Sequence, residues 1–254
     1  MRAKKYFTKN TVKEAKWTPC IAYGGGVNSV AMVLLMIEKG IQFKHILFSD
    51  TKGEKPGTYD YNHMFSDYLK EKGYPGIIRI SRSGSLYDDC IAQNRLPSIA
   101  YGFKSCSEVW KRRPYVQFLI QNDLFPVITY KGIDAGEEDR QRDELEIREK
   151  IRYPLVEEGM DREDCKDYIL QHGLPLPPKS ACFFCPSSSP ADVRSLPPDL
   201  QEKALLMEKN AKKKKGSSIR GLGRRHRWED WLKIQELPFE EFTALPKLSC
   251  DCDL

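Results

Sequence analysis

Short apolar runs alternate with segments of helical apolar spacing along the first 155 residues of the chain. The short runs predict strands near residues 20–23, 45–49, 76–80, 127–131 and 152–155. The segments with helical spacing predict helices near residues 29–39, 59–72, 86–93, 111–122 and 137–149. Strands and helices that alternate in this order build a parallel sheet. The pattern therefore predicts an α/β fold, in which a twisted, mostly parallel sheet carries helices on both faces.

The chain changes character after this alternating region. An amphipathic helix is expected near residues 161–172, and it ends at Gly173 before a proline-rich exit. A further helix is expected from about residue 198 to residue 213. We therefore divide the chain into a basic arm (1–16), an α/β domain (17–175) and a C-terminal segment rich in cysteine and basic residues (176–254).

Three consecutive glycines, Gly24, Gly25 and Gly26, follow the first predicted strand. Asn28 and Ser29 come next and open the first predicted helix, which either of them can cap. The first N–H groups of a helix have no acceptor within the helix, and glycine lets the backbone approach an anion closely. The pattern predicts a phosphate-binding loop, although a tight turn without a ligand uses the same residues.

Size and cysteine content narrow the class of protein. A chain of 254 residues is long enough for one large α/β domain. Its longest apolar run, residues 30–37, is too short to cross a bilayer, and its first residues lack the apolar segment of a signal peptide. We expect a cytoplasmic protein without a membrane partner, in which the eight cysteines do not form a disulfide framework. Cys20, Cys90 and Cys165 occupy apolar positions and are expected in the core.

The other five cysteines are candidate metal ligands or reactive thiols: Cys106, Cys182, Cys185, Cys250 and Cys252. Two of them, Cys182 and Cys185, have the spacing of a metal-binding pair, and Pro186 follows them. The alternative is a reduced, half-buried pair in a core patch rich in phenylalanine.

The net charge of +5 is unevenly distributed. A lysine run at 212–215 is followed by further cationic residues: Arg220, Arg224, Arg225, His226 and Arg227. This basic segment predicts contact with tRNA or DNA through their phosphates, or else a solvated surface. Trp228 and Trp231 offer stacking surfaces, but tryptophans three residues apart on a helix also anchor it to a core.

When the glycine loop is considered together with Asp50 and Thr51 after the second predicted strand, the chain resembles a known family. It is similar to the phosphoadenosine phosphosulfate (PAPS) reductase family of the adenine nucleotide alpha-hydrolase, or PP-loop, superfamily, including its bacteriophage-encoded members. That family has a Ser-Gly-Gly-x-Asp-Ser loop, and here Gly24 replaces the first serine and Asn28 replaces the aspartate. The likeness continues through Cys106 to Pro114, the Gly132–Arg140 segment and the Cys182–Pro186 segment, so it covers roughly residues 18–195.

This resemblance implies that ATP or a related adenine nucleotide binds with Mg²⁺ at the carboxyl edge of the sheet. The implied nucleotide-binding residues are Gly24, Gly25, Gly26, Asn28, Ser29, Asp50, Thr51, Gly132, Glu137 and Arg140. Asn28 lacks the charge that would help to hold Mg²⁺. Asp50 could supply metal or ribose contacts or could be a helix cap, and Thr51 could merely continue the turn.

The basic residues Lys111, Arg112 and Arg113 suit an anionic substrate. Their alternative role is ion pairing with the many nearby acids, among them Glu137, Glu138, Asp139 and Asp143. The resemblance also implies that Cys106, Cys182 and Cys185 hold a 4Fe-4S cluster, with zinc as the alternative. The fourth ligand is open, because Cys250, Cys252 or His226 could fold back to the site or one iron could lack a protein ligand.

Three functions are compatible with these residues. The first is an enzyme that activates or transfers sulfur, in an ATP-dependent, pyrophosphate-releasing reaction on a nucleic acid, with Asp50 and Arg113 as catalytic candidates. The second is a sulfonucleotide reductase that uses Cys250 or Cys252 as nucleophile, although the flanking aspartates disfavour the thiolate. The third is a non-catalytic nucleotide-binding module with a structural zinc. The acceptor and the oligomeric state are left open.

Overall fold

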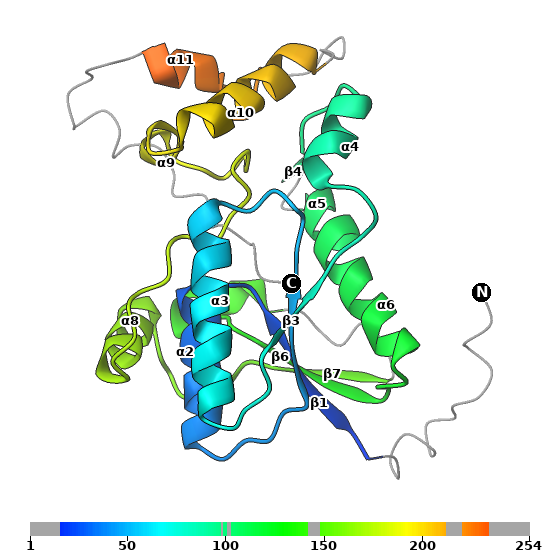
Figure 1. Cartoon of the computed structure of the whole chain (residues 1–254), viewed down its shortest axis with the longest axis vertical. Coiled ribbons are helices and arrows are strands. Elements are labelled where there is room, and N and C mark those ends of the chain that lie inside the picture. The colour runs from blue at the N-terminus through cyan, green and yellow to red at the C-terminus, as the bar shows by residue number, and fades with distance from the viewer. Residues whose placement is uncertain (1–15, 98, 101–102, 142–147, 212–219, 234–254) are drawn as a thin grey trace.

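A five-stranded, all-parallel sheet forms the centre of the computed structural model, which describes residues 16–97, 99–100, 103–141, 148–211 and 220–233 (Figure 1). The strand order is β3-β2-β1-β6-β7. The strands are β1 (Thr18–Tyr23), β2 (His45–Ser49), β3 (Ile77–Ile80), β6 (Val127–Lys131) and β7 (Glu149–Arg152). The predicted α/β fold with a twisted parallel sheet is confirmed.

Helices connect and flank these strands. The α-helices are α2 (Val27–Glu38), α3 (Pro56–Glu71), α4 (Leu86–Ala92), α5 (Ser105–Ser107), α6 (Arg113–Gln121), α7 (Pro154–Glu157), α8 (Arg162–Gln171), α9 (Pro190–Arg194), α10 (Pro198–Asn210) and α11 (Trp228–Lys233). A π-helical turn, η1 (Glu108–Arg112), joins α5 to α6, and a 3-10 helix, η2 (Ala135–Arg140), follows β6. The short strands β4 (Ile99–Ala100) and β5 (Phe103–Lys104) pair antiparallel.

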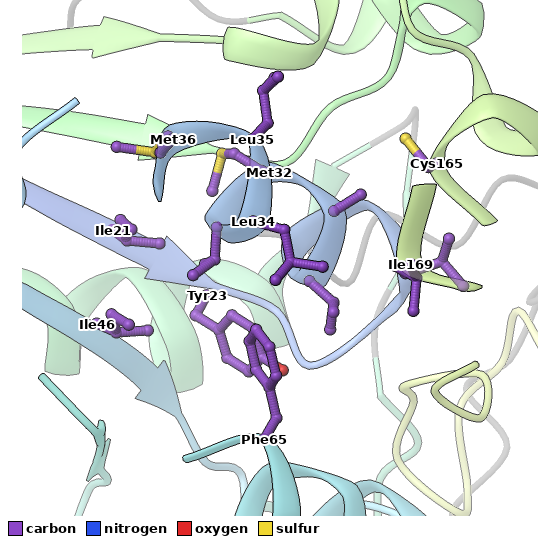
Figure 2. Packing of buried hydrophobic residues seen from close by; sticks show 14 of the residues in the cluster. Ile21, Tyr23, Met32, Leu34, Leu35, Met36, Ile46, Phe65, Cys165 and Ile169 are labelled. Carbon is purple, nitrogen blue, oxygen red and sulfur yellow. The ribbon is translucent and has the colours of Figure 1, made fainter. Parts of the chain in front are cut away.

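Alternate side chains of the central strands pack against helices on opposite faces of the sheet. Ile21 and Tyr23 of β1 join a cluster with α2, α3 and α8, in which the rings of Tyr23 and Phe65 stack with their centroids 6.1 Å apart (Figure 2). Cys20 and Ala22 of the same strand pack with α6 on the other face. This period of two residues is what a strand buried on both faces requires.

A second core lies beyond the sheet, where α9, α10 and α11 gather with α4 (Figure 1). Trp110 of η1 and Phe184 also contribute to it, so the C-terminal segment shares its core with elements from the α/β region. Trp228 is 0% exposed and Trp231 is 8% exposed. The interpretation of these two tryptophans as helix anchors is thereby confirmed.

Two predicted elements after β6 are wrong. Residues 137–149 do not form one helix, because η2 ends at Arg140 and Glu149 begins β7. The strand expected at 152–155 lies earlier, since Pro154 occupies the first turn of α7. The fifth strand was misplaced because β7 has the sequence Glu-Lys-Ile-Arg, which lacks an apolar run. The predicted core cysteines Cys20, Cys90 and Cys165 are each 0% exposed.

No helix in the described part of the chain is long and apolar enough to cross a membrane.

Candidate functional site

β1 and β6 are neighbours in the sheet but far apart in sequence. The chain adds β2 and β3 on one side of β1, and later adds β6 and β7 on the other side, so the strand order changes direction between β1 and β6. In open α/β sheets, ligands bind beyond the carboxyl ends of the strands at such a switch point. The glycine loop follows β1, and the Gly132 loop follows β6. A Cβ atom on Gly132 would lie 2.8 Å from the backbone nitrogen of Ser29. The two loops that the sequence analysis selected are therefore in direct contact.

The glycine loop leads directly into α2. Gly25 has a φ of 77°, which favours glycine, and Gly26 precedes the first helical residue. Ser29 Oγ donates to the Gly26 carbonyl oxygen at 2.9 Å and accepts from the Gly26 N–H at 3.1 Å. Within the described residues, no hydrogen-bond acceptor takes the N–H groups of Val27 and Asn28. These two groups are donors suited to an anion.

Asn28 lies between two charged side chains from distant parts of the chain. Its Nδ2 donates to Asp134 Oδ2 at 2.8 Å, and its Oδ1 accepts from Arg162 Nη1 at 3.2 Å. Asp134 is buried and also accepts the Gly136 N–H at 3.0 Å, which caps η2. An amide is suited to this position, because it can donate to the carboxylate and accept from the guanidinium at once. Asp134 thus supplies the negative charge that position 28 lacks.

We expect Asn28→Asp to place a second carboxylate against Asp134. Two carboxylates at hydrogen-bond distance do not both ionise freely, so the pair should hold one proton to unusually high pH. The variant should lose about 1–3 kcal/mol of unfolding free energy at pH 8, and the loss should shrink toward pH 5 as the shared proton binds. Urea unfolding at both pH values measures this dependence.

The double variant Asn28→Asp/Asp134→Asn is the control, because it restores one amide and one carboxylate with their places exchanged. It should recover most of the lost stability. Equal stability of the wild type and the single variant at pH 8 would contradict the contact.

A segment from the C-terminal part of the chain covers the glycine loop. Ser180 Oγ donates to the Gly24 carbonyl oxygen at 2.6 Å. Neighbouring residues fix this segment, because the Phe183 N–H donates to the Gly53 oxygen at 2.8 Å and the Lys55 N–H donates to the Ala181 oxygen at 3.3 Å. Gly24 and Gly25 are buried. A phosphate at the α2 N-terminus would therefore lie next to Ser180, which the sequence analysis did not identify.

Asp50 and Thr51 shape the turn after β2. Asp50 is fully buried, and its Oδ1 accepts from the Lys52 N–H at 2.7 Å and from the Tyr59 hydroxyl at 2.8 Å. Its other oxygen pairs with Arg79. Thr51 Oγ1 lies 3.1 Å from Cys182 Sγ. Asp50 does not cap a helix, because Lys55 is the N-cap of α3; it instead holds the turn after β2. Its catalytic role stays a prediction.

The three cations expected to bind a substrate anion each face a different carboxylate. Lys111 lies beside Glu54, Arg112 beside Glu149 and Arg113 beside Glu108. Lys111 is buried, whereas the Arg113 side chain is 65% exposed. The geometry favours ion pairing for Lys111 and Arg112, with partners other than the four acids named in the prediction. Arg113 keeps the exposure that a substrate contact requires.

Glu137 and Arg140 also lie at this edge of the sheet, on η2. Arg140 Nη1 pairs with Glu137 Oε2, one helical turn away. Because Asp134 caps the same short helix, the pair sits on an element that is tied to Asn28. The nucleotide-binding roles of Glu137 and Arg140 stay predictions.

The cysteine pair contacts the turn after β2. The Cys185 N–H donates to the Cys182 oxygen at 3.0 Å, and Cys182 Sγ lies 3.8 Å from Glu54 Oε1. Burial raises the pKa of the Cys182 thiol, and the negative charge of Glu54 raises it further, whereas Lys111 lowers it. The Cys182 thiol therefore keeps its proton at neutral pH.

The described residues do not assemble the predicted metal site. Cys106 and Cys182 both pack against the second core, but no group of three or more His, Cys, Asp or Glu side chains in this part of the chain is placed to hold a metal ion. Cys250 and Cys252 lie outside the described residues. A cluster or zinc held by Cys106, Cys182 and Cys185 is thus not supported by the donor set, and we derive no reaction step from it.

A scan against protein-family models and a search of curated proteins found no match to this chain.

Proposed function

We propose that this chain binds an adenine nucleotide by its phosphates at the glycine loop. The observation that carries the proposal is the position of this loop, since it opens α2 at the switch point between β1 and β6. The open N–H groups of α2 and the guanidinium of Arg162 both favour an anion there. The adenine preference comes from the resemblance to the PAPS reductase family.

Each side chain at this edge has a distinct task in the proposed complex. The N–H groups of Val27 and Asn28 donate to phosphate oxygens, and Arg162 neutralises their charge. Asp134 would hold a Mg²⁺ ion in place of its contact with Asn28 Nδ2, because Mg²⁺ commonly uses one or two carboxylates together with substrate phosphates and waters. Ser180 can donate to the phosphate after it releases the Gly24 oxygen.

The proposed reaction is the activation of an acceptor by adenylylation. The acceptor forms a bond to the α-phosphorus of ATP, the bond from that phosphorus to the bridging oxygen breaks, and pyrophosphate leaves with the electron pair. A hydrosulfide-level sulfur donor then forms a bond to the acceptor carbon that carries the adenylylated oxygen, the bond from that carbon to oxygen breaks, and AMP leaves with the oxygen and the electron pair. A nucleic acid is the acceptor that fits the basic C-terminal segment. The reaction predicts pyrophosphate release that depends on ATP and increases when tRNA or DNA is added.

We expect Arg162→Ala to weaken ATP binding about tenfold, because it removes one charge-assisted hydrogen bond from the phosphates. Arg162 is exposed, so the fold should tolerate the change. Isothermal titration calorimetry with ATP measures the effect, and GTP tests the base preference. The matched control is Arg152→Ala, which removes an exposed arginine of β7 that pairs with Glu157 of α7. This variant should leave ATP binding unchanged.

Unchanged ATP affinity in the Arg162→Ala variant would contradict the proposed site. ATP binding without pyrophosphate release, with or without nucleic acid, would instead indicate a binding module. If the wild type produces sulfite from a sulfonucleotide and the Cys250→Ser/Cys252→Ser variant does not, the protein is a reductase.

A further inference from the structure

Residues 220–227 form a compact turn, which we call the arginine turn. The Arg220 N–H donates to the Arg224 oxygen at 2.6 Å, and the Arg224 N–H donates to the Gly221 oxygen at 2.9 Å. Gly223 and His226 pair in a second short bridge. The backbone of this basic sequence is thus folded back on itself and fixed, unlike a solvated run of cationic residues.

A buried carboxylate accepts hydrogen bonds from the backbone of the arginine turn and from the start of α11. Glu208 of α10 is 7% exposed, and its Oε1 accepts the Leu222 N–H at 2.6 Å and the Trp228 N–H at 2.9 Å. A Cβ atom on Gly221 would lie 2.3 Å from the same oxygen. Within the described residues, no cation pairs with Glu208, so backbone N–H groups compensate for the burial of its charge. The carboxylate sets the shape of the turn and anchors it to the start of α11.

The outer side of the turn is cationic. Arg220, Arg225 and His226 are exposed, and Arg224 and Arg227 are half-buried. Arg227 lies 3.6 Å from Glu229, but the other three arginines have no carboxylate partner in the described part of the chain. Uncompensated guanidinium groups attract phosphates, and because the backbone of the turn is fixed, it loses little conformational entropy when they bind.

An exposed ring lies within the same turn. The His226 imidazole is tilted over the buried Trp231 ring, with the centroids 6.3 Å apart, and it is exposed to solvent. Unpaired bases stack on aromatic rings and on guanidinium planes, whereas the bases of a duplex are already stacked. The combination of arginines with an exposed ring therefore fits a single strand better than a duplex.

We propose that the arginine turn docks single-stranded nucleic acid through its phosphates, and that Glu208 is the positioning residue that keeps the turn in its binding shape. The inference deepens the proposed function, since it assigns the acceptor polymer to named residues. Binding of the polymer needs no nucleotide, so it can be tested separately from the glycine loop.

The test is the fluorescence anisotropy of a labelled 20-nucleotide single-stranded RNA, titrated with the full chain at several salt concentrations and without ATP. Arg220→Gln/Arg225→Gln should weaken binding roughly tenfold or more and should reduce the slope of log affinity against log salt by about 2. The matched control is Lys39→Gln/Arg152→Gln, which removes two exposed cations elsewhere and should bind like the wild type.

Glu208→Gln separates positioning from net charge. The variant is more positive than the wild type, so a purely electrostatic effect would tighten binding. The proposal expects weaker binding, because the amide nitrogen of glutamine would face the N–H groups of Trp228 and Glu229 and would loosen the turn. Circular dichroism and ATP titration of the same variant check that the rest of the chain is folded.

Three results would overturn the inference: wild-type RNA affinity and salt slope in Arg220→Gln/Arg225→Gln, tighter RNA binding by Glu208→Gln, or equal displacement of the RNA by duplex DNA or heparin. ATP affinity in the arginine variants should equal that of the wild type. If the wild-type chain does not bind ATP, the proposed function is contradicted, but the inference about RNA binding is not affected.

Discussion

Replacing Glu149 with alanine is expected to lower the free energy of unfolding by about 3–5 kcal/mol, because it leaves a largely buried guanidinium without its carboxylate. Glu149 is 1% exposed at the start of β7, and it pairs with Arg112 through both oxygens. Thr129 Oγ1 also donates to Glu149 at 2.7 Å, and the Tyr115 hydroxyl lies 3.0 Å from Thr129. Removal of the carboxylate therefore disrupts a buried network that joins β6, β7 and α6.

Urea unfolding of the Glu149→Ala variant measures the loss. The control is Glu157→Ala, which breaks an exposed ion pair with Arg152 and should cost about 0–1 kcal/mol. The comparison also bears on function, because Arg112 was a candidate ligand for a substrate anion. A loss of less than about 1 kcal/mol in Glu149→Ala would mean that Arg112 does not depend on this partner, and it would restore Arg112 as an anion-binding residue.

The sequence predicts the strands that are rich in apolar residues and misplaces the strand that is not. β1, β2 and β6 are apolar runs that end at glycine or aspartate, so their positions follow from hydrophobic spacing. β7 pairs with β6 alone, and its charged residues carry no such signal. Glu149 is held in this strand by its contact with Arg112. Local sequence patterns do not reveal that contact, because the two residues are 37 positions apart in the chain.

The residues of the candidate site also differ in whether the sequence could predict them. The glycine loop could be predicted, because its chemistry depends on the residues next to it in sequence. Asp134, Arg162 and Ser180 could not, since they meet that loop from positions 106 to 156 residues away. The only local signal was that Asp134 lies in the loop after a predicted strand. Asn28 is an example. The sequence offers no reason for an amide at this position, whereas the fold brings Asp134 and Arg162 to its two polar atoms.

Gly132→Ala is expected to weaken ATP binding at least tenfold and to lower the free energy of unfolding by about 1–3 kcal/mol, because the added methyl group overpacks the switch point. The new Cβ would lie 2.8 Å from the Ser29 nitrogen and 2.9 Å from the Ser29 Cα. Both are backbone atoms, so no side-chain rotation relieves the contact, and either the first turn of α2 or the loop after β6 must move.

The matched control is Gly136→Ala, four residues further along the chain in η2, where the nearest atom would be Asp134 Oδ1 at an ordinary contact distance of 3.4 Å. Urea unfolding and calorimetric titration with ATP should separate the two variants. The loss of stability in Gly132→Ala follows from packing alone, whereas the loss of affinity requires phosphates at the α2 N-terminus. A destabilised Gly132→Ala variant with wild-type ATP affinity would therefore place the nucleotide elsewhere on the chain, even though the contact between the two loops is real.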